Sequence, residues 1–156
     1  MQLPKKPHLR LSTVRAAADR WYARYIRLRD TQEQNGKRVG KCVTCGKFRN
    51  IWKLECGHYQ SRRHDPTRWD ALNSHTQDTA CNKWRSGEQA IMALYINNKY
   101  GKGSAQKLIL KSRDKRRFLK YEVKGIADYY KGKCEEILGE DNLTDKRWNE
   151  ILNQWK

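Results

Sequence analysis

Two cysteines spaced for metal binding stand in the stretch KCVTCGK. Cys42 and Cys45 form a Cys-x-x-Cys pair, a spacing that lets two thiolates reach one tetrahedral zinc ion. Downstream, Asp78 and Cys81 repeat the same three-residue step, and a carboxylate binds zinc at about the same distance as an imidazole nitrogen. We therefore expect a structural zinc site of Cys42, Cys45, Asp78 and Cys81, with Cys56 as the competing fourth ligand. A knuckle without metal, or one with redox chemistry, is the alternative.

His58, in the stretch LECGHYQSRR, is the residue best suited to acid–base chemistry. The alternation of Trp52, Leu54, Cys56 and His58 predicts a β-strand with these side chains on one face. Histidine, with a reference pKa of ~6.5, can accept a proton from water at neutral pH. The alternative is a histidine with a structural or zinc-binding role.

The charge of the chain indicates a polyanionic partner. Lys and Arg number 34 against 17 Asp and Glu, which gives a net charge of +17. Neutralising phosphates releases counterions, so nucleic acid is the first partner to consider and anionic membrane the second. No apolar segment approaches the ~20 residues that cross a bilayer, and the N-terminus lacks the apolar core of a secretory signal. We expect a soluble, cytoplasmic protein.

Basic residues near His58 and in a later charge run are expected to contact phosphates. Arg62 and Arg63 follow His58 closely, and the run KSRDKRRFLK concentrates positive charge. In most proteins such a run is only a solvated helical face, but the net charge favours phosphate contacts here. The predicted nucleic-acid-binding residues are Arg62, Arg63, Lys83, Arg85, Lys111, Arg113, Lys115, Arg116 and Arg117.

The elements that must position these residues predict an α+β protein. A length of 156 residues suits one domain, or a small domain with helical extensions. Residues 1–11 are interpreted as a basic arm, and 12–38 as a helix that starts at an N-cap, Ser12, and ends near QNGK. Residues 39–100 are expected to form a β-hairpin and a helix that opens at ACNKW, breaks near Gly87 and stops at Gly101. Residues 101–156 are expected to be basic and helical, with Thr144 capping the last helix.

Apolar stripes are expected to bury one face of the first helix and of the later helical region. Val14, Ala18, Trp21, Tyr25 and Leu28 recur at steps of three and four, which predicts core packing rather than a stacking platform. A similar stripe in the C-terminal half includes Cys134, which we expect to be buried. These stripes could supply a dimer interface or close the core of the monomer.

The predicted hairpin and the helix after it resemble the ββα-metal arrangement of HNH nucleases. The runs YIRLRD, CVTCGK, GHYQSR, WDALNSHTQ and CNKWRSG, over roughly residues 15–138, resemble more specifically the phage NinG family, also called Rap. Members of that family are recombination endonucleases that cut branched DNA. The resemblance implies a zinc knuckle beside a small nuclease core, flanked by helices.

The resemblance also implies roles for single residues. His58 would be the general base, Asn73 would orient it, and Asn82 would bind a catalytic Mg²⁺ or Mn²⁺. Asn73 and His75 match the N-x-H of the family. Where the family has Cys-x-x-Cys-Asn, this chain has Asp78 in place of the first cysteine, which bears on the strength of the zinc site.

The second ligand of the catalytic metal is left open by the sequence. Many HNH proteins carry a metal ligand directly before the base, but Gly57 has no side chain to offer. The candidates are Asp70, His75 and Asp65, of which Asp70 is preferred because it lies beside Asn73 in the same short segment.

The expected function is that of a metal-dependent endonuclease cutting branched DNA, such as Holliday junctions, in phage recombination. A four-armed substrate has two symmetric strands, so a homodimer is the economical assembly. The alternatives are a zinc-stabilised nucleic-acid-binding module without catalysis, and an RNA-binding or RNA-processing protein.

Overall fold

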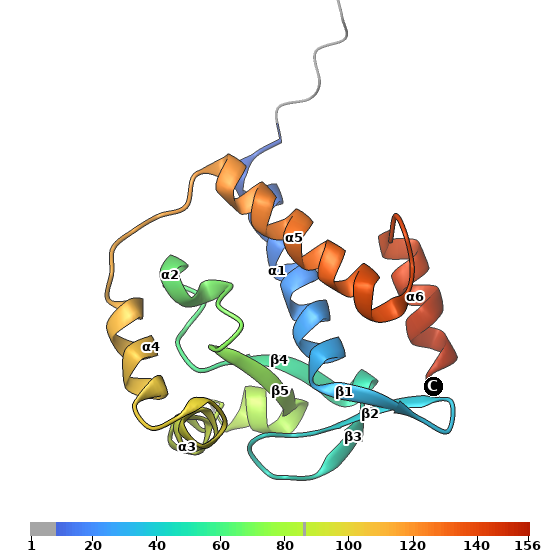
Figure 1. Ribbon diagram of the computed structural model, residues 1–156, viewed down its shortest axis with the longest axis horizontal. Helices are drawn as coiled ribbons and strands as arrows, with labels where there is room; N and C mark the ends of the chain where they lie inside the picture. The colour runs from blue at the N-terminus through green and yellow to red at the C-terminus, as the bar shows by residue number, and fades with distance from the viewer. Residues whose placement is uncertain (1–8, 86) are drawn as a thin grey trace, which may run out of the picture.

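The computed structural model describes residues 9–85 and 87–156, and it combines helices with two small antiparallel sheets (Figure 1). This confirms the α+β prediction. The elements, in chain order, are α1 (Leu11–Arg29), β1 (Thr31–Gln34), β2 (Lys37–Lys41), β3 (Phe48–Asn50), the 3-10 helix η1 (Ile51–Lys53), β4 (Leu54–His58), α2 (Asp65–Arg68), β5 (Ser74–Asp78), the π-helix η2 (Ala80–Trp84), α3 (Gln89–Tyr100), α4 (Ser104–Ser112), α5 (Lys120–Leu138) and α6 (Asp145–Gln154).

The stretch QNGK is a β-hairpin turn and not the end of a helix. Helix α1 stops at Arg29, and β1 pairs with β2 through a turn at Asn35 and Gly36, both with positive φ. Two positive φ angles are what a two-residue hairpin turn requires, and Asn-Gly is the sequence best suited to it. The predicted helix over 12–38 was therefore too long. The N-cap is also not Ser12, because α1 begins at Leu11 after Arg10.

The second sheet pairs β4 with β5. His58 lies opposite Ser74, and Gly57 lies opposite His75, so the predicted hairpin is confirmed. Trp52, however, belongs to η1 and not to the strand. A long connection over 59–73, which includes α2, joins the two strands, and η2 follows β5 directly.

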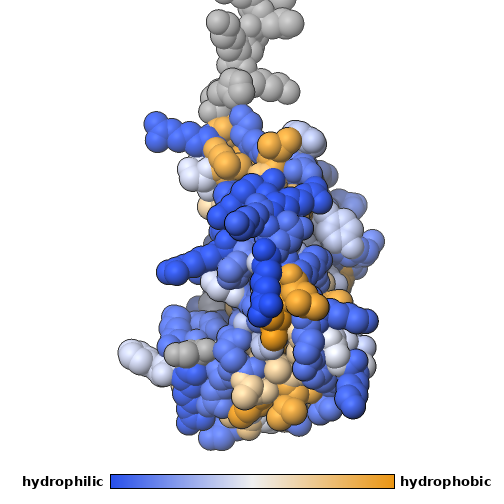
Figure 2. Space-filling view, turned by 90° about the vertical axis from the view of Figure 1, so that its left-hand side faces the viewer, coloured by the Kyte–Doolittle hydropathy of each residue, from blue (hydrophilic) through white to orange (hydrophobic). Residues whose placement is uncertain are grey.

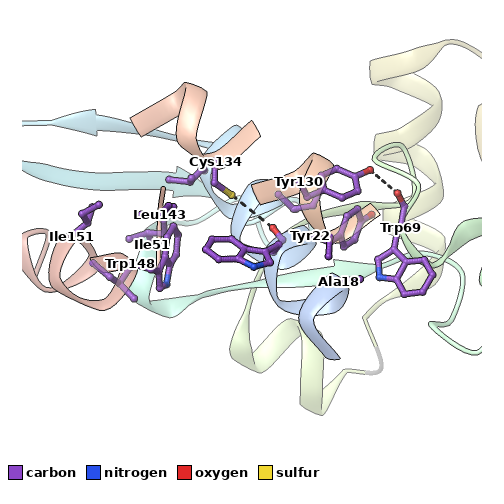
Figure 3. Close-up of a cluster of buried hydrophobic side chains, with 14 of the residues drawn as sticks. Ala18, Tyr22, Ile51, Trp69, Tyr130, Cys134, Leu143, Trp148 and Ile151 are labelled. Carbon is purple, nitrogen blue, oxygen red and sulfur yellow. Dashed lines mark hydrogen bonds between the residues drawn. The ribbon is translucent and has the colours of Figure 1, made fainter. Parts of the chain in front are cut away.

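The main core forms where α5 packs along α1 (Figure 1). Figure 3 shows Tyr22, Trp69 and Tyr130 in this core, where the Tyr130 hydroxyl donates to the Trp69 carbonyl at 2.6 Å. Cys134 is buried, as predicted, and its thiol lies 3.8 Å from the Trp21 carbonyl. The stripes of α1 and α5 thus pack on each other within one chain.

The C-terminal half departs from the predicted helices in one place. The predicted break at Gly87 and stop at Gly101 are confirmed, and Thr144 caps α6 by accepting from the Arg147 backbone N–H at 3.1 Å. Residues 113–119, the centre of the charge run, form a non-helical linker between α4 and α5. No helix in the described part of the chain is long and apolar enough to span a membrane.

Candidate functional site

Three cysteines from two separate segments come together. The sulfur atoms of Cys42, Cys45 and Cys81 all lie within 4.8 Å of one another. Burial opposes ionisation of Cys42, but backbone N–H groups of Asp78, Cys45 and Thr44 hold the pKa of its thiol below the usual range. Burial and the two neighbouring thiols raise the pKa of Cys81. Three cysteine sulfurs this close together can coordinate one cation, so this cluster can hold a structural metal ion.

Asp78 lies outside this cluster of ligand atoms. Its carboxylate accepts from Arg49 Nε at 2.5 Å and from the Ala80 backbone N–H at 2.9 Å. The rival ligand Cys56 is also outside the cluster, and its side chain packs against the main core. Among the described residues, the structure therefore assembles three of the four predicted zinc ligands.

The cysteine cluster anchors the segment that follows β5. Cys81 lies in η2, and Gln77 of β5 donates to the Thr44 hydroxyl at 2.6 Å and to the Gly87 carbonyl at 2.8 Å. The Gly87 N–H in turn donates to the Cys81 carbonyl at 3.1 Å. The knuckle, β5 and the turn after η2 are thus tied together around the three sulfurs.

A polar cleft of about 610 Å³ lies beside β4, and we call it the His58 cleft. It contains the predicted base and the predicted metal-binding asparagine, which lie 24 residues apart in the sequence. Its lining residues include Tyr22, Glu55, His58, Arg62, Asn82 and Lys83.

His58 is half-buried with a defined ring orientation. Its Nε2 lies 3.2 Å from the Arg68 carbonyl, and its ring packs 5.7 Å from that of Tyr22, centre to centre. A carbonyl only accepts, so Nε2 carries the proton and Nδ1 is left as an acceptor. Burial and the positive charge of Arg62 lower the pKa of His58 from its usual 6.5 to about 4. The imidazole is therefore neutral at physiological pH.

Asn73 is fully buried and forms hydrogen bonds to the segment before Arg68, whose carbonyl contacts His58. Its amide donates to the carbonyls of Gln60 and Thr67 at 3.0 and 2.9 Å, and its oxygen accepts from the Gln60 N–H at 2.7 Å. These bonds fix both ends of the segment 60–67. Asn73 therefore positions His58 through the backbone of this segment, next to Arg68, rather than by a bond to the imidazole.

Asn82 pairs with a carboxylate that the sequence analysis missed. The Asn82 amide donates to Glu55 Oε2 at 2.8 Å, and Lys83 Nζ lies 3.1 Å from Glu55 Oε1. Burial works against ionisation of Glu55, but the bonds from Asn82 and Lys83 hold its pKa below the usual value. The cleft thus presents a carboxylate and an amide oxygen, which are the ligand types that Mg²⁺ and Mn²⁺ prefer.

The position directly before His58 has no room for a ligand. A Cβ on Gly57 would lie 1.9 Å from Gln77 Oε1, so the buried Gln77 side chain requires glycine there. Alternate residues of a strand share a face, and Glu55 is the next residue of β4 on the face of Gly57. This alternation was the sequence signal that could have found Glu55.

The structure places the other predicted metal ligands outside the His58 cleft. His75, opposite Gly57, is buried and contacts Arg29 at 2.9 Å and Asp30 at 3.4 Å through Nδ1. Asp70, the preferred candidate, accepts from the Leu72 N–H at 2.9 Å and pairs with Lys111 at 2.6 Å.

Asp65, the third candidate, is also outside the cleft and is buried. It forms a two-pronged ion pair with Arg15 and accepts from the Phe118 N–H at 3.1 Å. It also lies 3.5 Å from Arg117. Asp65 therefore joins α1 and the linker to the start of α2. Each of the three candidates, Asp65, Asp70 and His75, thus has structural contacts outside the His58 cleft.

The predicted phosphate-binding residues fall in two places. Arg62 and Lys83 line the His58 cleft, with Arg85 close behind in sequence. Most of the others gather in a second hollow of about 450 Å³, which we call the linker pocket; its lining residues are Arg63, His64, Asp65, Ser112, Arg113, Asp114, Lys115, Arg116 and Arg117. Figure 2, viewed from the side of α4 and the linker, shows a largely hydrophilic surface broken by apolar patches.

The cations of the linker pocket differ in how far they are engaged. Arg116 pairs with Glu122 at 2.7 Å, and Arg117 contacts Asp65 and the Arg63 carbonyl. The exposed side chains of Arg113 and Lys115 have no hydrogen bond or ion pair with any described residue. These two are free to bind an external anion.

A third hollow, of about 580 Å³, lies beside Cys42 and Cys45 and includes Lys41 and Lys99. None of the predicted catalytic residues lines it. His58 and Asn82 line the His58 cleft, whereas this hollow borders the cysteine cluster.

A comparison with family models identifies relatives of this chain. The model of the family described as Bacteriophage Lambda NinG protein matches residues 5–140. The chain belongs to this family. The NinG match covers the cysteine cluster, the His58 cleft and the linker, and it indicates a function related to phage recombination. Comparisons with curated proteins and with solved structures gave no match.

Proposed function

We propose that this NinG-family protein is a metal-dependent endonuclease that cuts branched DNA, with His58 as the general base. The observation that carries the proposal is the arrangement of the His58 cleft. A neutral imidazole with an unprotonated Nδ1 shares one polar cleft with the Glu55–Asn82 pair and with the cations Arg62 and Lys83. Phosphodiester hydrolysis needs this combination of a base, oxygen ligands for a cation, and positive charge for the phosphate.

His58 Nδ1 would take a proton from the attacking water. The bond from Nε2 to the Arg68 carbonyl holds the ring in the tautomer that leaves Nδ1 unprotonated. Asn73 fixes the neighbouring segment, so the ring orientation does not depend on the substrate. Arg62 and Lys83 would attract the scissile phosphate.

Glu55 and Asn82 would hold the divalent cation. The hydrogen bond from the Asn82 amide to Glu55 leaves the Asn82 amide oxygen available as a ligand. A bound Mg²⁺ or Mn²⁺ would offset negative charge that develops on the phosphate and the leaving oxygen. Zinc at Cys42, Cys45 and Cys81 would be structural and would keep Asn82 in place through η2.

Cutting of DNA is best tested together with binding. A labelled four-way junction, a matched linear duplex and a single-stranded RNA are incubated with wild type and His58→Ala, in Mg²⁺, Mn²⁺ or EDTA. We expect wild type to cut the junction only with metal, and His58→Ala to bind it with similar affinity but cut it about 10²- to 10⁴-fold more slowly.

Two outcomes would overturn the proposal. If neither protein cuts any substrate while both bind tightly, the protein is a zinc-stabilised binding module. If only the RNA is cut, or only RNA is bound, the substrate class is wrong. Thermal unfolding of both proteins controls for loss of fold in the variant.

A further inference from the structure

Trp84 is the most exposed of the large apolar side chains in the described chain, at 83%. Tryptophan has a large apolar ring that proteins usually bury in a core or an interface. It is the last residue of η2. The indole therefore projects into water from η2, the element that also carries Cys81 of the cysteine cluster and Asn82 of the His58 cleft.

The turn that carries Trp84 is held at both ends. On one side, Cys81 belongs to the cysteine cluster. On the other, Gly87 donates to the Cys81 carbonyl at 3.1 Å and accepts from the Gln77 amide at 2.8 Å. Ser86 lies outside the described residues. Because both ends are anchored, the exposure of the ring is a feature of the fold and not of a chain end.

Trp84 is close to the His58 cleft and is flanked by positive charge. It follows Asn82 by two residues, a length of chain that spans at most about 7 Å. Its neighbours Lys83 and Arg85 have side chains that are 61% and 62% exposed. Lys83 also pairs with Glu55, and Arg85 with Glu88. An exposed aromatic ring that two cations flank in the sequence, two residues after Asn82 of the His58 cleft, has the chemistry of a stacking site for a base.

We propose that Trp84 stacks on an unstacked nucleobase of the nucleic acid in the His58 cleft, and so favours branched or single-stranded substrates over linear duplex. This inference rests on the proposed function, because it assumes that the cleft holds nucleic acid. In a linear duplex each base is already stacked on its neighbours, so the indole has no free base to contact. At a branch point, or in a single strand, a free base face is available.

The test measures binding without cutting. The affinities of wild type, Trp84→Ala and Trp84→Phe for a four-way junction, a single-stranded oligonucleotide and a matched linear duplex are measured by fluorescence anisotropy in EDTA. The control is Phe48→Ala, which removes another exposed aromatic ring, 66% exposed, from β3. Unfolding curves should be the same for all four proteins, because both rings lie in solvent.

We expect Trp84→Ala to weaken binding to the junction and the single strand by about 5- to 150-fold, and to the duplex by less than about 2-fold. Trp84→Phe should retain part of the difference, and Phe48→Ala should change none of the affinities. An equal loss for junction and duplex, or no loss for either, would overturn the inference.

A spectroscopic measurement separates stacking from a general contact. A 2-aminopurine base at the branch point should lose fluorescence on binding wild type but not on binding Trp84→Ala. If wild type cuts nothing but shows this quenching, the endonuclease proposal fails and the stacking inference stands. If wild type cuts junctions and Trp84→Ala discriminates substrates equally well, only the stacking inference fails.

Discussion

At the scale of single residues, the protonation of His58 has a defined physical cause. Burial removes part of the ring from water, and the positive charge of Arg62 disfavours a second positive charge on the imidazole. Both effects act against imidazolium, so the pKa falls. The imidazole therefore stays neutral across the whole physiological pH range.

The first prediction concerns this pKa. NMR titration of His58 should give a value near 4, and Arg62→Ala should raise it towards 6.5 without restoring it fully, because burial remains. The kcat/KM for cutting, which reports the free enzyme, should stay level from pH 7 to about pH 5 and fall below that. A His58 that titrates at 6.5 in the wild type would contradict this account of the cleft.

The low pKa also has a consequence for stability. The unfolded chain takes up a proton on His58 near pH 6.5, whereas the folded chain does so only near pH 4. Between these values the unfolded state binds more protons, so the contribution of His58 to the free energy of unfolding decreases as the pH falls through this window.

The second prediction concerns Glu55 as a metal ligand. Glu55→Gln keeps the size and the hydrogen-bonding oxygen of the side chain but removes its charge. The Mg²⁺ or Mn²⁺ concentration for half-maximal cutting should rise by roughly 10-fold or more. Glu33→Gln, at an exposed position of β1, is the matched control and should leave it unchanged. An unchanged metal dependence in Glu55→Gln would mean that Glu55 is not a ligand of the catalytic metal.

At the scale of elements, the cysteine cluster decides where η2 lies and hence where Asn82 lies. The cluster joins the knuckle between β2 and β3 to the start of η2, two segments about 40 residues apart in the sequence. A metal ion there would act as a cross-link that holds the helix end of the His58 cleft.

The third prediction follows from this cross-link. Wild type should carry one zinc per chain by native mass spectrometry, and Cys81→Ser should lose it. Loss of a structural metal should cost at least about 3 kcal/mol, which lowers the melting temperature by roughly 10 °C. Cys56→Ser should keep its zinc. If Cys56→Ser loses it instead, Cys56 is a ligand after all.

The linker between α4 and α5 is the second element with a functional consequence. Because it is extended, it brings its cations against the segment that follows His58, and Asp65 fastens it there. A nucleic acid in the His58 cleft would find the free side chains of Arg113 and Lys115 on a neighbouring surface.

The fourth prediction tests these two cations. Arg113→Ala with Lys115→Ala should reduce the slope of log Kd against log salt by about 2 for junction binding. The control, Lys37→Ala with Lys53→Ala, removes the same charge from β2 and η1, which lie away from the linker pocket (Figure 1). Equal slopes for the two double variants would mean that the linker pocket makes no specific phosphate contacts.

At the scale of the whole molecule, the apolar stripes of α1 and α5 are used inside one chain. They are therefore not available as a dimer interface. The expected homodimer still has a rationale in the substrate, because a four-way junction offers two equivalent strands to two copies.

The fifth prediction is that two copies assemble on one junction. Gel filtration with light scattering should give the mass of a junction with two chains when protein is in excess. Linear duplex of the same length is the control for non-specific loading. A complex that stays at one chain per junction would remove the homodimer from the proposal.

Features of the fold and of the candidate site were predictable from the sequence where they depend on residues close together in the chain. The Cys-x-x-Cys spacing, the stop at Gly101, the cap at Thr144 and the apolar stripe of α1 depend on neighbouring residues, and each was predicted correctly. The hairpin at Asn35 was also local, and it was missed because the helical stripe was extended past its end.

The pairing of distant groups was decided only by the tertiary structure. Glu55 is a candidate ligand because β5 and η2 bring Asn82 beside it. Asp70 and Asp78, by contrast, form ion pairs with Lys111 and Arg49 outside the predicted metal sites. In a chain with 34 basic residues, a carboxylate has many available partners, and its sequence neighbourhood does not select one. Residue types and short spacings thus determined which chemistry is available. Long-range packing decided which side chains share a site. The physical reason is that each carboxylate pairs with the cation or amide that the fold brings within reach.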